Sequence, residues 1–323
     1  MSLLSLIAAL LLEQFHPLAS RKQLFAWLNS YVHFFQHHFN AGEHKHGKIA
    51  WLIAVLLPVL GSAALYWLLY SISPVFAWMF SVLVLYLTMG FRQFSHYFTD
   101  IHQALRNDDL EKARTLLSSW RGAPCNELNA EEVARVTIEE ALLASHYHVF
   151  GVMTWFVITM LLGLGPSGAV LYRLALFLNS RWGRQDSIEF GQFGEFARQA
   201  YHWIEWLPLR LTAITFAIVG DFEDTVYGWR TQAQSWPDPE SGIVLASGAG
   251  ALGVRLGRPI PQDGLPMIVL SWVWAMKPMR LHAKRSGVGM ACPGVLDDFV
   301  AAVGNGDFSR RVITVVYSTR IIH

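Results

Sequence analysis

The chain has 323 residues, of which 53% are hydrophobic and only 15% are charged, and its mean hydropathy is +0.31. Soluble domains carry about 25% charged residues, so a soluble globule of this size is excluded. The apolar content excludes a disordered chain, two cysteines exclude a disulfide scaffold, and a net charge of +1 gives no support for nucleic-acid binding. We therefore predict an all-α, multi-pass helical integral membrane protein, with the lipid bilayer as its main partner.

The stretch from Ile49 to Phe91 carries no charged side chain and is the strongest membrane signal. A helix crosses the hydrocarbon core with about 20 apolar residues, so the stretch predicts two spans, at 49–70 and 75–91. Pro74 separates them, because proline fits the first turn of a helix but not its interior.

Two further spans are predicted at 148–165 and 203–220. The second contains Arg210, for which two interpretations stay open: it faces a partner or a polar cavity, or its side chain snorkels to the membrane surface. Basic residues flank the first hairpin on both sides, which places these flanks in the cytoplasm. A lone crossing at 148–165 would put later arginines outside, so we expect residues 169–178 to return as the second half of a hairpin.

Residues 99–146 form the largest polar segment and predict cytoplasmic helices. One helix is expected to start near Asp109, where acidic residues precede basic ones as the helix dipole favours. Another is expected at 131–144, with Arg135 and Glu139 on one face at a spacing of four residues. This pair is either a solvated ion pair or a functional one.

Five histidines lie between His33 and His46. His33 and His37 share one helix face and could hold a metal ion, but the HExxH arrangement is missing. Phenylalanines interleave with the histidines, so we favour an amphipathic interfacial helix and predict no metal site from these residues.

Two G-x-G-x-x-G strings occur, at 163–168 and 248–253. A dinucleotide site needs such a string between a strand and a helix, and the first string instead ends a predicted membrane helix, so we expect a turn. The second lies in a run of small residues, where glycine permits either close helix packing or close approach of the backbone to an anionic ligand.

The chain resembles the CobD/CbiB family of cobalamin-biosynthesis membrane proteins, with its AmpE-like relatives, over about residues 1–262. The resemblance is carried by the N-terminal apolar run with His16-Pro17, residues 104–114, Gly165-Pro166 with Gly168 and Tyr172-Arg173, residues 206–213 and, most specifically, residues 249–257. Their order and spacing together make the match strong.

The resemblance implies a bacterial-type inner-membrane enzyme similar to adenosylcobinamide-phosphate synthase. This enzyme is an ATP-dependent ligase that uses Mg²⁺ and joins a carboxylate of adenosylcobyric acid to aminopropanol or its phosphate. A corrinoid substrate and other membrane proteins of the corrinoid pathway are the implied partners. The implied catalytic residues are Arg135 and Glu139, and the implied substrate- or phosphate-binding residues are Arg210, Gly250, Gly253, Arg255 and Gly257.

The sequence departs from the family's catalytic stretch after Glu139. Acidic, amide and glycine positions of that stretch fall here on Leu143, Ala144, Tyr147 and His148. The AmpE-like proteins also lack this stretch, so the alternative is a non-catalytic membrane protein of regulation or signalling.

A second departure covers residues 263–323, where the family's Arg-Pro-Glu-Leu-Gly-like string and final membrane helix are missing. The codons that can encode residues 268–280 also permit a frame one base earlier, which spells Asp-Arg-Pro-Glu-Leu-Gly. Our hypothesis is a frameshift near residues 264–267 that replaced the native tail.

Overall fold

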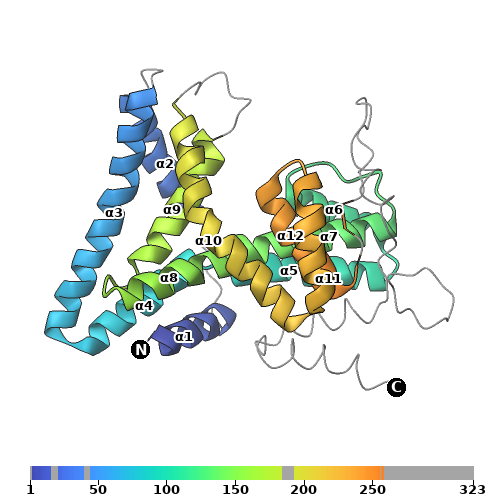
Figure 1. The fold of residues 1–323 in the computed structure, drawn as a ribbon, viewed down its shortest axis with the longest axis horizontal. Helices are drawn as coiled ribbons and strands as arrows, with labels where there is room; N and C mark the ends of the chain where they lie inside the picture. The colour runs from blue at the N-terminus through green and yellow to red at the C-terminus, as the bar shows by residue number, and fades with distance from the viewer. Residues whose placement is uncertain (1, 16–20, 40–43, 184–192, 255, 258–323) are drawn as a thin grey trace. The chain divides into compact units, whose positions relative to one another are not determined.

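The computed structural model describes residues 2–15, 21–39, 44–183, 193–254 and 256–257, and in these ranges the regular structure is entirely helical (Figure 1). The predicted all-α class is confirmed. The chain divides into two compact units, one built from residues 1–92 and 147–208 and the other from 93–146 and 209–323. The predicted tail at 263–323 lies outside the described residues.

Unit 1 is the more apolar part. It contains α1 (Ser2–Phe15), α2 (Arg21–Phe39), α3 (His44–Ile72), α4 (Pro74–Thr88), α8 (Gly151–Leu161), α9 (Ser167–Trp182) and the first half of α10 (Glu195–Val219). The predicted break between the first two spans is confirmed. The Ser73 side chain accepts a hydrogen bond from the backbone N–H of Val75, and Pro74 occupies the first turn of α4.

Two helices are long and apolar enough to cross a membrane among the described residues, His46–Ile72 and Ala130–Leu161. The most apolar window of the first is only 11% buried, as expected for a helix whose side chains face lipid. The second contains α7 (Ala130–Ser145), a π-helical turn at His146–Phe150 and α8. The helix is thus continuous from the predicted polar segment into the predicted span. Crossings at 75–91, 148–165 and 203–220 stay predictions.

The predicted return after α8 is confirmed as a helical hairpin within unit 1. Gly168 of α9 packs against the backbone of Trp155, and Gly151 of α8 packs against the ring of Tyr172, so the two helices are antiparallel. Gly163 and Gly165 have φ angles of +76° and +64° in the connection, a conformation that glycine adopts without strain. The first glycine string is therefore a turn, as predicted.

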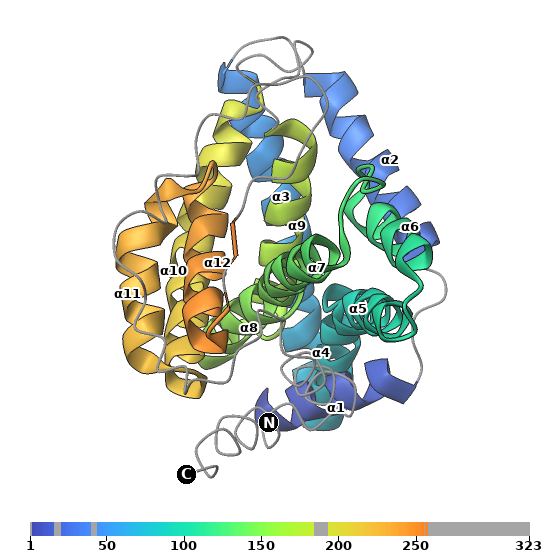
Figure 2. The same cartoon turned by 90° about the vertical axis from the view of Figure 1, so that its right-hand side faces the viewer.

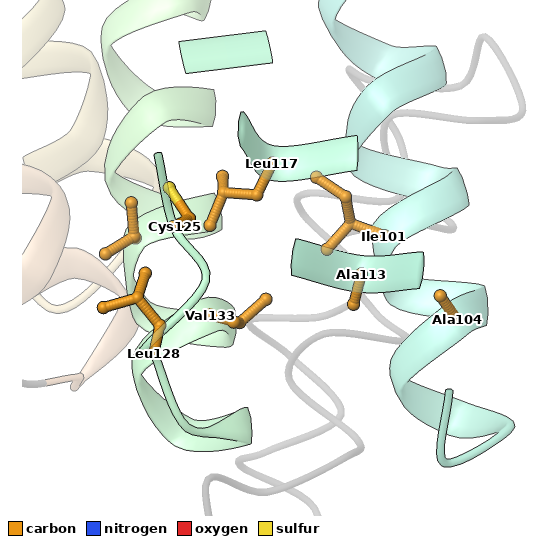
Figure 3. Close-up of a cluster of buried hydrophobic side chains, with 8 residues drawn as sticks. Ile101, Ala104, Ala113, Leu117, Cys125, Leu128 and Val133 are labelled. Atoms are coloured by element: carbon orange, nitrogen blue, oxygen red, sulfur yellow. The ribbon is translucent and has the colours of Figure 1, made fainter. Parts of the chain in front are cut away.

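Unit 2 holds the whole of the polar segment at 99–146, and its described residues pack around three apolar clusters. It contains most of α5 (Phe91–Arg106), then α6 (Leu110–Arg121), α7, the second half of α10, α11 (Phe222–Gln232), η2 (Ala233–Ser235) and α12 (Pro239–Leu252). Figure 3 shows the first cluster, in which Ile101, Ala113 and Leu117 of neighbouring helices meet Leu128 and Val133. This packing seats α6 and α7 against α5 and so fixes the start of α7.

The start of α7 is a capping box. Asn129 Oδ1 accepts a hydrogen bond from the Glu132 N–H at 2.9 Å, and the Glu132 carboxylate accepts one from the Asn129 N–H at 2.9 Å. Loss of such a cap costs about 1 kcal/mol. Asn129→Ala is therefore expected to lower the free energy of unfolding of the full-length protein by about this amount in chemical denaturation. Asn126→Ala, a neighbouring exposed asparagine that caps no helix, is the control, and equal effects of the two would contradict the role of the cap.

Candidate functional site

Arg135 and Glu139 form a buried ion pair on α7. The Arg135 Nη1 atom lies 3.0 Å from Glu139 Oε1, and the two side chains are only 8% and 14% exposed. The interpretation as a solvated ion pair is wrong, because both side chains are largely withdrawn from water. Charges withdrawn from water in this way need close partners.

Glu139 also contacts a segment far away in the sequence. Its Oε1 atom accepts a hydrogen bond of 2.8 Å from the backbone N–H of Gly257, 118 positions along the chain. Leu256 anchors this segment in a second apolar cluster of unit 2, made of Leu142, Leu209, Val244, Leu245, Ala249 and Leu256. Gly257 has a φ angle of +82°, and a Cβ atom there would lie 2.7 Å from the Trp236 ring. Glycine is required here for both reasons.

One terminal nitrogen of Arg135 has no protein partner in the part of the chain that the structure describes. Its Nη2 atom is buried without a hydrogen-bond partner among the described residues. Buried polar groups are nearly always hydrogen-bonded, and guanidinium groups bind carboxylates and phosphates through two parallel N–H donors. The Arg135–Glu139–Gly257 cluster therefore offers a positively charged donor to an oxyanion.

The second glycine string lies within α12 and packs against neighbouring helices. Gly248 faces Leu142 of α7, and Gly250 faces the backbone of Asp224 and Thr225 of α11. Figures 1 and 2 show α11 and α12 side by side. This arrangement supports the packing interpretation for both glycines, and a role of Gly250 in ligand binding stays a prediction. Burial raises the pKa of the Asp224 carboxyl, and the carboxylates of Asp221 and Glu223 raise this pKa further.

For the remaining predicted site residues, no contact with the Arg135–Glu139–Gly257 cluster is described. Gly253 ends α12 with a φ angle of +64°, and its Cβ position is open. Arg210 is half-buried on the part of α10 that belongs to unit 2, and both of its interpretations remain predictions. Arg255 lies outside the described residues. The structure thus brings together Arg135, Glu139 and Gly257 from the predicted set.

The histidine-rich segment shows no metal centre within its described part. His33 is exposed and His46 is half-buried, while the side chains of His37, His38 and His44 lie outside the described residues. Over the part of the chain that the structure describes, no group of three or more His, Cys, Asp or Glu side chains could hold a metal ion.

A polar centre inside the apolar bundle of unit 1 was not predicted from the sequence. Arg173 Nη1 lies 2.7 Å from His148 Nδ1, and because a guanidinium only donates, Nδ1 is the acceptor. Tyr172 donates from its hydroxyl to Glu205 Oε1 at 3.3 Å, and both residues are buried. Ionisable residues within apolar spans commonly mark functional positions, and this signal could have singled out Glu205.

Comparison with known proteins identifies the family. The CobD/Cbib protein family model matches residues 3–264, and the match ends where the sequence was predicted to depart from the family. A cobalamin biosynthesis protein CobD from Stutzerimonas stutzeri is 36% identical over 265 residues, covering 79% of this chain and 82% of that protein. One from Chromobacterium violaceum is 38% identical over 205 residues, covering 64% of this chain and 63% of that protein.

No solved structure matches the chain. The family match covers most of the sequence and includes both segments that form the Arg135–Glu139–Gly257 cluster. The chain belongs to the CobD/CbiB family of cobalamin-biosynthesis membrane proteins.

Proposed function

We propose that this protein is a membrane-bound ligase of cobalamin biosynthesis that forms an amide bond between a corrinoid carboxylate and aminopropanol or its phosphate. The observation that carries the proposal is the Arg135–Glu139–Gly257 cluster. Two segments 118 positions apart, both within the family match, meet there through a hydrogen bond of 2.8 Å. The meeting leaves Arg135 Nη2 without a protein partner among the described residues.

The chemistry requires an activated carboxylate, because an amine does not displace the oxygen of a free carboxylate. ATP and Mg²⁺ would supply this activation when bound. Arg135 would hold an oxyanion of the reacting molecules in a largely water-excluded site, where a fixed cation has its greatest effect. Arg210 and Arg255 are proposed to contact phosphate oxygens. Mg²⁺ needs no cage of protein ligands here, since it commonly binds through one or two carboxylates together with substrate phosphates.

The alternative is a non-catalytic, AmpE-like membrane protein acting in regulation or signalling. The observation that favours it is the composition of the stretch after Glu139. Leu143, Ala144, Tyr147 and His148 occupy positions at which the synthases carry hydrophilic groups, and His148 is engaged by Arg173.

Complementation separates the two functions. Full-length protein expressed in a strain that lacks its corrinoid-ligase activity is expected to restore growth without added cobalamin. Membranes from that strain are expected to consume adenosylcobyric acid in the presence of ATP and aminopropanol phosphate. A folded, membrane-inserted protein that gives no turnover would overturn the ligase proposal. The AmpE-like alternative predicts instead that deletion spares corrinoid synthesis and alters the response to β-lactams.

We also propose that the tail at 263–323 results from a frameshift near residues 264–267. Its support is the end of the family match at residue 264. Complementation is therefore performed with the chain as printed and with the tail restored to the earlier reading frame. Resequencing of the 3′ end of the gene tests the frameshift directly, and finding no open frame for a final membrane helix would refute it.

A further inference from the structure

The Oε1 atom of Glu139 accepts two hydrogen bonds. One comes from Arg135 Nη1 at 3.0 Å and the other from the Gly257 backbone N–H at 2.8 Å. A carboxylate oxygen has two lone pairs, so both acceptor positions of Oε1 are occupied by the protein itself. The carboxylate is thereby placed between a helix and a loop segment and connects them.

We propose that Arg135 is the oxyanion-binding residue of this site and that Glu139 is a positioning residue. Glu139 holds the guanidinium in one orientation and holds the backbone at Gly257 against α7. Arg135 Nη2, buried and without a protein partner among the described residues, then donates to an oxyanion of the ligand. The identity of that ligand rests on the proposed function, but the arrangement of the three residues does not.

Three observations support these roles. The Arg135 side chain is 92% buried, the complement of its 8% exposure, so a ligand atom reaching Nη2 would be shielded from water, which strengthens a charge-assisted hydrogen bond. The ion pair with Glu139 partly offsets the cost of burying the guanidinium before the ligand arrives. A side chain at Gly257 would collide with the Trp236 ring. The backbone that Glu139 holds therefore packs tightly against Trp236.

The oxyanion could come from two sources, a phosphate group of the nucleotide or the carboxylate of the corrinoid. Binding of each to full-length protein in detergent distinguishes them, with ATP as one probe and adenosylcobyric acid as the other. Arg135→Gln is expected to weaken the binding of one of the two by at least about 10-fold, which is the scale of one lost hydrogen bond to a charged group.

Arg121→Gln is the matched control for this change. Arg121 lies on α6 and pairs with Glu140 at 3.4 Å, but both side chains are 29% exposed. The control is expected to bind both probes within twofold of the unmodified protein. Binding of both probes by Arg135→Gln within the same twofold would overturn the role of Arg135.

Hydrogen exchange at the Gly257 amide, measured together with turnover, tests the role of Glu139. Glu139→Ala removes the acceptor and is expected to speed exchange in the peptide around Gly257 at least 10-fold. Glu139→Gln keeps an acceptor oxygen, so the amide is expected to stay protected and turnover to fall less than 10-fold. Unchanged exchange in Glu139→Ala, or loss of turnover with retained protection in Glu139→Gln, would overturn the positioning role.

The ligase function and the roles of Arg135 and Glu139 can be refuted independently of each other. Absence of turnover in the unmodified protein, with probe binding and exchange behaving as expected, would refute the ligase function and leave the roles of Arg135 and Glu139 standing. Turnover that is insensitive to Arg135→Gln would refute those roles and leave the ligase function standing.

Discussion

Gly250→Val is expected to lower the free energy of unfolding of unit 2 by about 3 kcal/mol, which approaches the upper end of the cost of overpacking a well-packed core. The Cβ atom would meet the backbone carbonyl of Asp224 and the Cα of Thr225. A backbone on a neighbouring helix cannot turn away as a flexible side chain can. The valine is therefore accommodated only if α11 and α12 separate.

Gly61→Val is the matched control. Gly61 lies within α3, and apart from its own stretch of helix no atom of the described residues lies within 4 Å of its Cβ position. Valine has a slightly better helix propensity than glycine, by a few tenths of a kcal/mol, so this change is expected to be neutral or weakly stabilising. Chemical denaturation of both variants in detergent provides the measurement. Equal stabilities would show that α11 and α12 are not in close contact.

The starts of α6 and α4 were predictable because their signals are local. Asp109 accepts a hydrogen bond from the Lys112 N–H and begins α6, and Ser73 with Pro74 begins α4. A cap satisfies backbone donors within the next three residues, so a few adjacent residues are enough to predict where the helix begins.

The burial of the Arg135–Glu139 pair could not be predicted because it depends on residues far away in the chain. A spacing of four residues places two side chains on one helix face but does not say what covers that face. Here the segment at Leu256 and Gly257 packs beside α7. The run of small residues in α12 likewise allowed two interpretations, because only its contact with α11, a tertiary feature, favours close helix packing.

The π-helical turn at His146–Phe150 also could not be predicted from the sequence. A π turn places one extra residue in a helical turn, and neither proline nor glycine lies within this segment to mark it. His146 within it is buried and lies 2.8 Å from Thr212. The hydrogen bond joins positions 66 residues apart, so it is set by tertiary packing rather than by local preference.

The free energy of unfolding is expected to fall by about 3 kcal/mol in Glu139→Leu, at the lower end of the cost of breaking a buried pair from one side. The change leaves the Arg135 guanidinium, 8% exposed, without its counter-charge, and it also removes the acceptor of the Gly257 N–H. Adding Arg135→Met to the same chain is expected to recover most of the loss, because the double variant contains no uncompensated buried charge.

A double-mutant cycle on the more accessible pair, Arg121 and Glu140, provides the comparison. Arg121 and Glu140 are half-buried at 29% exposure and 3.4 Å apart, so their pairing energy is expected to stay in the range of about 0–1 kcal/mol of pairs in contact with water. Glu140→Leu combined with Arg121→Met is therefore expected to show a coupling energy below about 1 kcal/mol, against about 2 kcal/mol for the buried pair. If the double variant of the buried pair is as stable as the unmodified protein yet no longer binds either probe, the pair serves ligand binding rather than stability. Equal couplings in the two cycles would mean that Arg135 remains hydrated, and its Nη2 atom would then be satisfied by water rather than offered to an oxyanion.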